Sequence, residues 1–495
     1  MSEARSNRHS RSHSGSSSGA RRVEQQRADA GRFAVLAVFV MAVFVLGGGA
    51  RDDLQSLLLL RPAAVGFAAW ALWVAAPGDL KAIRIPLALL LVLVVLIAVQ
   101  LVPLPPEVWH ALPGREAIAR RDALVGLSDN WRPLSLSPSK SWNSLVSLIV
   151  PLAALLLLAV QPATSRLRIV EVLLIVAATS AVLGLAQILG PAGGPLYFYN
   201  ITNEASAVGL FANRNHHASF LAASFPLLGW YFLFAIRSEL LLSRLWVSCV
   251  VGGAGLWTLV IALSGSRSGL VLFGLAVAVV LFQFRMAQKR GRFSRQRGPL
   301  PFSPRPLSTR WARIALWAGL VAAVVAAIWV VPQLPAFQRF GAEAYAADVR
   351  FSAAPTIFAM AREAFPAGMG FGAFEHAYKA YEPDALLTSS YLNQAHNDFL
   401  QLAVEAGLPG LMLLVLALFW LGGRFRAVLP WLRRAEPDAW LALTALGSLG
   451  LLAAASTVDY PLRTPSQMVF AVLLVVFALY PPSATRPARP GNEQR

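Results

Sequence analysis

The sequence predicts an all-α polytopic membrane protein of about twelve transmembrane helices. Three observations predict this fold class: charged residues make up only 14 % of the 495 residues, apolar residues make up 56 %, and long apolar runs recur along the chain. Average soluble proteins carry about 25 % charged residues. This chain therefore lacks the charge to cover several soluble domains. The composition excludes a soluble multidomain enzyme, a disordered protein and, with Cys249 as the single cysteine, a secreted disulfide scaffold.

A helix that crosses a membrane needs about 20 mostly apolar residues. Stretches of this kind give the predicted spans, which are 33–50, 54–76, 82–102, 142–160, 167–189, 215–236, 245–263, 268–285, 314–331, 396–421, 439–457 and 466–480. They define a membrane domain over residues 32–482. A long extracytoplasmic loop, 332–395, separates the ninth span from the tenth, and its mixed composition favours short helices on the outer membrane face.

The two ends of the chain differ from the membrane domain. Residues 1–31 are rich in Ser and Arg and have almost no large apolar side chains, so we expect a disordered basic tail. Residues 483–495 form a short C-terminal tail. With both tails in the cytoplasm and alternating spans, about two thirds of the 43 Lys and Arg fall on the cytoplasmic side, as is usual for multi-span membrane proteins.

The net charge of +18 has two explanations. In a soluble protein such an excess would suggest nucleic acid. Here the most basic segment, 285–313, contains no acidic residue and lies in a predicted cytoplasmic loop. Contact with anionic lipid is sufficient to explain it, so we expect membrane lipids and no nucleic acid as partners.

Soluble-enzyme motifs are missing, and the polar residues that remain gather at the predicted outer ends of spans. His396, Asn397 and Asp398 open the tenth span, where a helix N-terminus suits an anionic ligand. One alternative is that Asn or Asp only caps the helix. His396 is not needed as a cap, and a neutral imidazole there is a workable general base.

Three arginines lie at the same predicted face. Arg267 occupies a tight turn of small residues between the seventh and eighth spans, where it is either an interface anchor or a fixed anion ligand. Arg350 lies in the long loop, where an ordinary ion pair with Asp348 is the alternative. Arg463 follows the eleventh span.

Asn213 and Asn215 lie at the start of the sixth span and are the last of the polar residues at predicted outer ends of spans. The neighbouring His216 and His217 would point about 100° apart on a helix, with no acidic residue at ligand spacing. We therefore expect neither a metal site nor a cofactor. Arginine forks bind phosphate oxygens bidentately, so a lipid-linked diphosphate entering from the bilayer is the anion that fits two or three of them.

Several segments resemble the O-antigen ligase and O-antigen polymerase superfamily of bacterial inner-membrane glycosyltransferases. The strongest match is His396-Asn397 followed, after nine residues, by Gly407-Leu408-Pro409-Gly410. Weaker matches are GLFANRNHHASFL, LSGSRSGL, GMGFGAFEHAY after Arg350, and WRPLSLSPSKSW. Together they cover about residues 131–463, and their order along the chain makes the set specific.

The resemblance implies the function. Members transfer a glycan from undecaprenyl diphosphate to an acceptor hydroxyl at the periplasmic face, without metal or nucleotide. We expect a single in-line displacement at the anomeric carbon, which inverts its configuration. It implies His396 and Asn397 as catalytic residues, and Arg267 and Arg350 as diphosphate ligands. Arg463, Asn213 and Asn215 are further substrate-binding candidates.

Two questions stay open at this stage. The motifs do not separate a ligase, whose acceptor is lipid A–core, from a polymerase, whose acceptor is another lipid-linked glycan. The alternative function is a transporter or flippase that binds lipid-diphosphate glycans without chemistry, and a further one is a scaffold without a site. A transporter predicts a site near the membrane midplane. A transferase predicts His396 at the outer face near Arg267 and Arg350, and a scaffold predicts these residues far apart.

Overall fold

The computed structural model describes residues 6–162, 165–234, 240–293, 349–387, 391–432 and 437–479. Its elements are mainly helices, together with one two-stranded antiparallel ribbon that pairs β1 with β2. In chain order they are α1 (Ser6–Leu46), α2 (Leu57–Val74), α3 (Asp79–Ala82), α4 (Arg84–Gln100), β1 (Pro103–Leu104), α5 (Pro106–His110), α6 (Glu116–Leu124), β2 (Arg132–Pro133), α7 (Pro138–Ser147), α8 (Ile149–Ala159), α9 (Arg166–Leu189), α10 (Arg214–Phe234), α11 (Leu240–Leu263), α12 (Arg267–Phe293), α16 (Val349–Ala364), α17 (Phe374–Tyr378), η4 (Asp384–Leu386), α18 (Asp398–Leu432), α19 (Pro437–Ala455), η5 (Pro461–Arg463) and α20 (Pro465–Phe477).

Many of these helices are apolar enough to lie in a bilayer. Within the described residues, seven are long and apolar enough to cross a membrane. They are Val23–Leu46, Leu57–Val74, Pro138–Ala159, Leu167–Leu189, Arg267–Met286, Asp398–Leu432 and Asp438–Ala455. Shorter apolar helices cover Arg84–Gln100, Cys249–Leu263 and Pro465–Phe477. The chain is therefore a helical membrane protein, as the composition predicts.

The predicted count of about twelve spans stays a prediction. Each predicted span within the described residues coincides with a helix, or with α7 and α8 end to end in the case of 142–160. The span 314–331, much of the loop 332–395 and the tail 483–495 lie outside the described residues. The described part of that loop contains the helices α16, α17 and η4, and its extracytoplasmic location stays a prediction.

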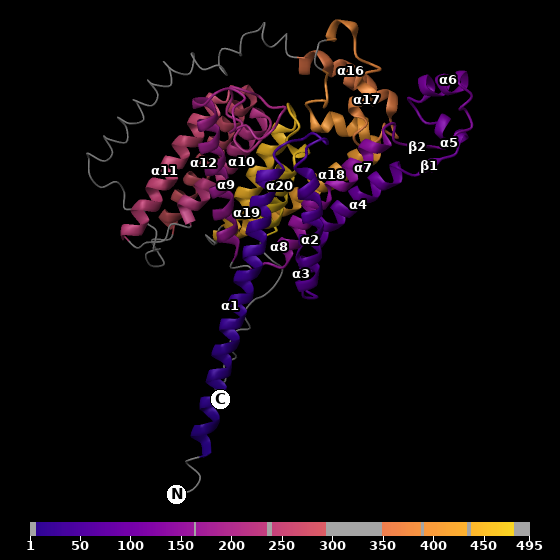
Figure 1. The fold of residues 1–495 in the computed structure, drawn as a ribbon. Helices are drawn as coiled ribbons and strands as arrows, with labels where there is room; N and C mark the ends of the chain where they lie inside the picture. The colour runs from indigo at the N-terminus through magenta and orange to yellow at the C-terminus, as the bar shows by residue number, and fades with distance from the viewer. Residues whose placement is uncertain are drawn as a thin grey trace.

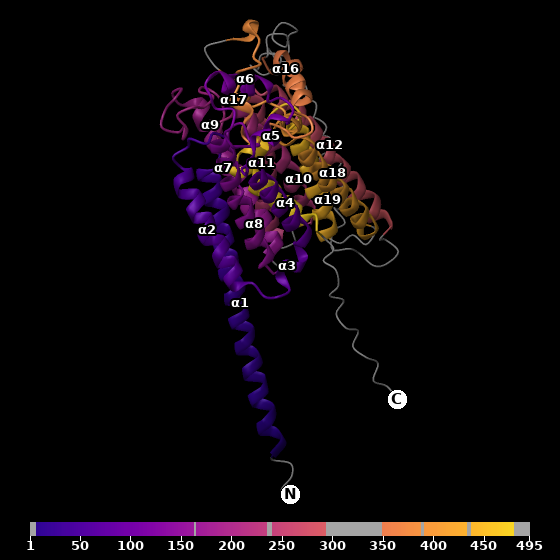
Figure 2. The same ribbon diagram turned by 90° about the vertical axis from the view of Figure 1, so that its right-hand side faces the viewer.

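The N-terminal segment differs from its prediction. Helix α1 begins at Ser6, so it continues through most of the segment expected to be disordered. In both views it projects away from the other helices (Figures 1 and 2). The side chains of residues 23–31 are almost all exposed, and burial starts at Leu36. The turns over residues 23–31 thus extend an apolar helix without burying a core, a possibility that composition alone does not reveal.

Helix α10 forms the centre of the bundle, where it packs against α9, α11, α12 and α19. Small residues allow this close packing, as is common between membrane helices. Ala218, Ala222 and Ala223 of α10 are fully buried. A Cβ atom at Gly269 would collide with the side chain of Ala218, so the glycine of the LSGSRSGL segment lets the start of α12 meet α10. This approach positions Arg267, the first residue of α12.

Helices α16, α17 and α6 lie at the end of the molecule opposite the N-terminal part of α1 (Figures 1 and 2). A separate apolar cluster joins α16 and α17 to the start of α18, with Ile357, Met360, Phe374 and Val404 among its buried members. Helix α16 therefore rests on the first turns of α18, directly beside the predicted catalytic residues.

A kink in α18 anchors this arrangement. Gly407 has a φ of 55°, a conformation that L-residues other than glycine rarely adopt. The kink exposes the backbone carbonyl of Glu405, which accepts hydrogen bonds from the Gly370 amide at 2.9 Å and the Gln100 side chain at 3.1 Å. The Gly-Leu-Pro-Gly ending of the His396 motif thus fixes the start of α18 against α4 and the loop before α17.

Candidate functional site

Asn397 caps α18. Its side-chain oxygen accepts hydrogen bonds from the backbone amides of Phe399 at 3.1 Å and Leu400 at 3.0 Å, and its amide nitrogen donates to the carbonyl of Thr457 at 3.0 Å. This is the geometry of an N-cap residue. The cap is therefore Asn397, while Asp398 accepts from the Ser456 hydroxyl at 2.9 Å. Asn397 positions its neighbour His396 at the helix start.

His396 directs one ring nitrogen towards a carboxylate. Its Nδ1 lies 3.2 Å from Oδ1 of Asp459, and its side chain keeps 15 % exposure. An ionised carboxylate only accepts, so Nδ1 carries the proton and Nε2 presents a lone pair. His396 also has a φ of 50°, which is uncommon for a residue other than glycine. Such backbone strain is often found at functional sites.

Asp459 is buried between the ends of α19 and η5. Its Oδ1 also accepts the backbone amide of Tyr460 at 3.0 Å. Burial by itself would raise the pKa of this carboxyl, but the neighbouring imidazoles of His216 and His396 hold the pKa well below its usual range. Asp459 is therefore ionised at neutral pH and can stabilise a positive charge on His396.

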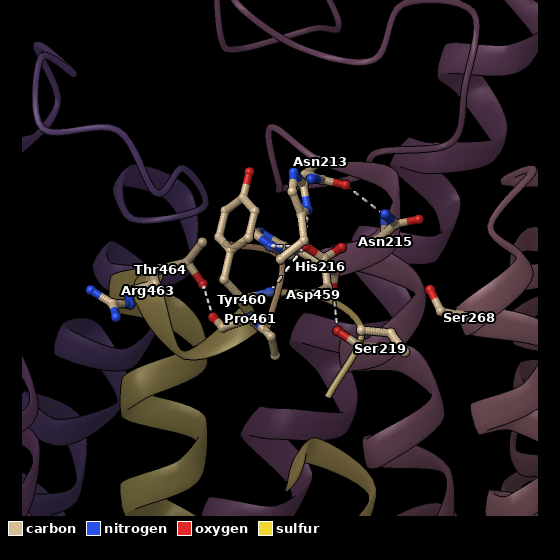
Figure 3. A network of polar contacts seen from close by, with 12 residues as sticks. Asn213, Asn215, His216, Ser219, Ser268, Asp459, Tyr460, Pro461, Arg463 and Thr464 are labelled. Atoms are coloured by element: carbon tan, nitrogen blue, oxygen red, sulfur yellow. Dashed lines mark hydrogen bonds and ion pairs between the residues drawn. The ribbon is translucent and has the colours of Figure 1, made fainter. Parts of the chain in front are cut away.

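Tyr460 separates two imidazole rings. Its ring centroid lies 4.8 Å from that of His396 and 5.0 Å from that of His216, both edge to face. Burial and the charge of Asp459 raise the pKa of the Tyr460 hydroxyl, so the hydroxyl stays protonated at neutral pH. Figure 3 shows His216, Asp459 and Tyr460 together above the bundle helices.

Arg350 reaches the same loop from α16. Its Nη1 donates to the carbonyl of Val458 at 3.4 Å, directly before Asp459. Its positive charge also lowers the pKa of Tyr460 in part, against the larger effect of burial. The alternative partner from the sequence, Asp348, lies outside the described residues. Helix α16 thus brings a predicted diphosphate ligand next to the His396–Asp459 pair.

Arg267 joins this region through its neighbour Ser266. The Ser266 hydroxyl donates to the side-chain oxygen of Asn215 at 2.8 Å. Asn215 in turn donates its backbone amide to the side-chain oxygen of Asn213 at 2.8 Å, a cap for α10 that Figure 3 shows as a dashed line. The first turns of α10 and α12 are therefore held together by Ser266 and Asn215. The partly buried Arg267 directly follows Ser266 in the chain, and Asn215 directly precedes His216.

The guanidinium group of Arg463 is paired with two carboxylates. Its two terminal guanidinium nitrogens each donate to Oε2 of Glu405 at 3.1 Å, and its Nε lies 3.4 Å from Asp398. Burial lowers the pKa of Arg463, but Glu405 and Asp398 more than offset this and raise it. The geometry favours a structural role, with α18 held to η5, over the predicted contact with substrate, which remains a prediction.

Residues 252–415 match the family model described as O-antigen ligase. This segment of the chain is similar to O-antigen ligases. This confirms the resemblance drawn from its motifs, and the family consists of glycosyltransferase-like ligases. No curated protein matches the chain.

The matched segment contains only part of the candidate site. Arg267, Arg350, His396 and Asn397 lie within residues 252–415. The first turn of α10 and the Asp459–Arg463 segment lie on either side of it in sequence. Helix α10 packs against α12, and α19 packs against α18, so both flanking segments lie next to the matched segment. The candidate site therefore needs residues from outside the matched segment.

Sequence reasoning did not select Asp459, His216, Tyr460 or Glu405 as site residues. One signal was available for Asp459: it is an acidic residue at the outer end of a predicted span, on the face where His396 was expected. His216 was considered only as a metal ligand. Among the described residues, no group of three or more His, Cys, Asp or Glu has the arrangement to hold a metal ion.

Proposed function

We propose that this protein transfers or polymerises a glycan, from an undecaprenyl-diphosphate-linked donor to an acceptor hydroxyl, at the periplasmic face of the bacterial inner membrane. The acceptor is lipid A–core or a growing lipid-linked polysaccharide. The observation that carries the proposal is the His396–Asp459 pair, with Nδ1 3.2 Å from the carboxylate and Arg350 hydrogen-bonded to the residue before Asp459. His396 and Arg350 lie in the segment that matches the O-antigen ligase family model. Both termini are placed in the cytoplasm by the charge distribution of the sequence.

The proposed reaction is a single displacement with inversion. The acceptor oxygen attacks the anomeric carbon while its proton passes to Nε2 of His396. The bond between the anomeric carbon and the phosphate oxygen breaks, and the diphosphate leaves with the electron pair. Asp459 stabilises the imidazolium that forms, in the manner of a carboxylate behind a catalytic histidine. Arg267 and Arg350 stabilise the negative charge that develops on the leaving diphosphate.

The position of His396 supports a transferase over the transporter or flippase alternative. His396 lies just before the first residue of α18 with its side chain 15 % exposed, and Arg350 lies on helix α16, within the predicted loop. A transporter that uses these residues would require them near the middle of the spans. A scaffold without a site would not require His396, Asp459 and Arg350 to meet on one loop.

Reconstitution with purified lipids tests the proposal. The full chain in liposomes is given an undecaprenyl-diphosphate glycan together with either lipid A–core or a second lipid-linked glycan, and products are identified by mass spectrometry. Transfer to the first acceptor identifies a ligase, and elongation of the second identifies a polymerase. If neither product forms while a fluorescent lipid-linked donor crosses the bilayer, the protein is a flippase and the proposal is wrong.

The replacement of Arg267 or Arg350 by lysine is expected to lower kcat for transfer by about 10-fold to 100-fold, because a lysine keeps the charge but loses the bidentate fork for phosphate oxygens. Steady-state rates with the reconstituted variants measure this. Arg121→Lys, at an exposed position on α6, is the matched control and should transfer at the rate of the unaltered protein. Full activity in Arg267→Lys and Arg350→Lys would contradict the diphosphate assignment.

A further inference from the structure

A second histidine faces Asp459, and the mechanism above does not use it. His216, in the first turn of α10, is 1 % exposed, and its Nε2 lies 3.8 Å from Oδ1 of Asp459. Neither ring nitrogen of His216 makes a hydrogen bond within the described part of the chain, and the same holds for Oδ2 of Asp459. A buried imidazole and a buried carboxylate oxygen with unused hydrogen-bonding capacity therefore lie side by side.

Such an arrangement lowers the stability of the fold, because buried polar groups without hydrogen-bond partners are unfavourable. A functional role for these groups would explain why they are present. Other atoms of His216 are held in place: its backbone carbonyl accepts from Gln467 at 2.9 Å and from the Ser219 hydroxyl at 2.9 Å. The edge of its ring also packs against Tyr460, which is packed in turn by His396. The ring of His216 is thus aimed at the Asp459 carboxylate by several independent contacts.

We propose that His216 is a positioning residue that shares the Asp459 carboxylate with His396, and so limits how strongly Asp459 holds the proton that His396 takes from the acceptor. This rests on the proposed transferase function. The proton balance is simple: His396 takes the acceptor proton on Nε2, keeps its Nδ1 proton, and releases the acquired proton to water after the product leaves. Asp459 stays ionised throughout.

His216 should weaken the attraction of Asp459 for a proton on His396 whether His216 is neutral or protonated. A neutral His216 offers an N–H dipole to the carboxylate, and a protonated His216 offers a full positive charge. Both reduce the negative potential that Asp459 exerts on His396. Without His216, Asp459 attracts a proton on His396 more strongly, so His396 would stay protonated to higher pH and would be a base over a narrower range.

Other charged and titratable groups surround the pair and stay constant in the test. They are Tyr460, whose ring packs against both imidazoles, Arg350, which donates to the carbonyl of Val458, and Asp398, whose charge acts on Asp459. None of them is altered in a His216 variant. A change in the titration of His396 is then assigned to the loss of the second imidazole.

The experiment is an NMR titration of histidine-labelled full-length protein in detergent micelles, with the His396 signal assigned through His396→Ala. In His216→Phe, which keeps a ring against Tyr460 but removes the donor, we expect the titration midpoint of His396 to rise by about one pH unit. His216→Gln keeps an amide donor and should restore most of the difference. An unchanged midpoint in His216→Phe would overturn the proposal. If the Phe variant does not fold, His216→Leu, which also lacks a donor, is compared with the unaltered protein in the same way.

The titration needs no substrate, so it separates this inference from the proposed function. If the unaltered protein transfers glycan, the acidic limb of its pH–rate profile should move to higher pH in His216→Phe, in step with the NMR midpoint. A role for His216 in packing alone would lower the rate at all pH values without moving that limb. Absence of transfer by the unaltered protein would refute the proposed function and leave the titration to decide on His216.

Discussion

Replacement of His396 by alanine is expected to lower the rate of glycan transfer by at least about 100-fold, because the acceptor hydroxyl then loses the base that removes its proton. Replacement of Asp459 by asparagine should have an effect of at least similar size. The amide preserves the volume of the side chain but carries no charge to stabilise an imidazolium, and it can donate to Nδ1 and select the wrong tautomer of His396. Initial rates with saturating donor and acceptor lipids measure both effects.

The matched control is His376→Ala, which removes an exposed imidazole from α17. It should leave the rate of transfer and the thermal unfolding of the protein unchanged. His396→Ala and Asp459→Asn should also combine without a further large loss, because the two residues act on one proton. Full transfer activity in His396→Ala would refute the assignment of the base.

The fold was largely predictable because membrane helices follow from a local rule. A run of about 20 apolar residues must form a helix in a bilayer, since the backbone has no other way to satisfy its hydrogen bonds there. Helices α9 and α19 follow the predicted spans closely for this reason. The rule says nothing about where a helix ends in water, so the extension of α1 to Ser6 and the division between α7 and α8 were not foreseen.

The site was predictable in part. His396, Arg267 and Arg350 were selected because they lie at predicted outer ends of spans, and the resemblance implied their roles, which stay predictions. Asp459 lies 63 residues after His396, and it meets His396 only because α18 and α19 pack with their ends together. No local sequence pattern indicates that His396 and Asp459 are in contact. Likewise, the sequence permits either Asn397 or Asp398 to cap α18, and only the positions of Thr457 and Ser456 decide between them.

The contacts of Arg463 also could not be predicted from the sequence. Its place at an outer helix end makes it a candidate ligand, because the sequence contains no information about which carboxylates it meets. In the structure both of its terminal nitrogens contact Glu405, whose side chain is fully buried. The two roles predict different outcomes when the arginine is removed.

Arg463→Met is expected to destabilise the protein by about 3 kcal/mol, because it leaves the charge of Glu405 buried without its partner. This is the lower end of the range for a buried ion pair, since the Arg463 side chain keeps 21 % exposure. Denaturant unfolding in mixed micelles, followed by tryptophan fluorescence, measures the loss. The double variant Arg463→Met/Glu405→Gln removes both charges and should recover most of it, as a double-mutant cycle would show. If Arg463→Met unfolds like the unaltered protein but loses transfer activity, Arg463 binds substrate, and the original prediction from the sequence is correct.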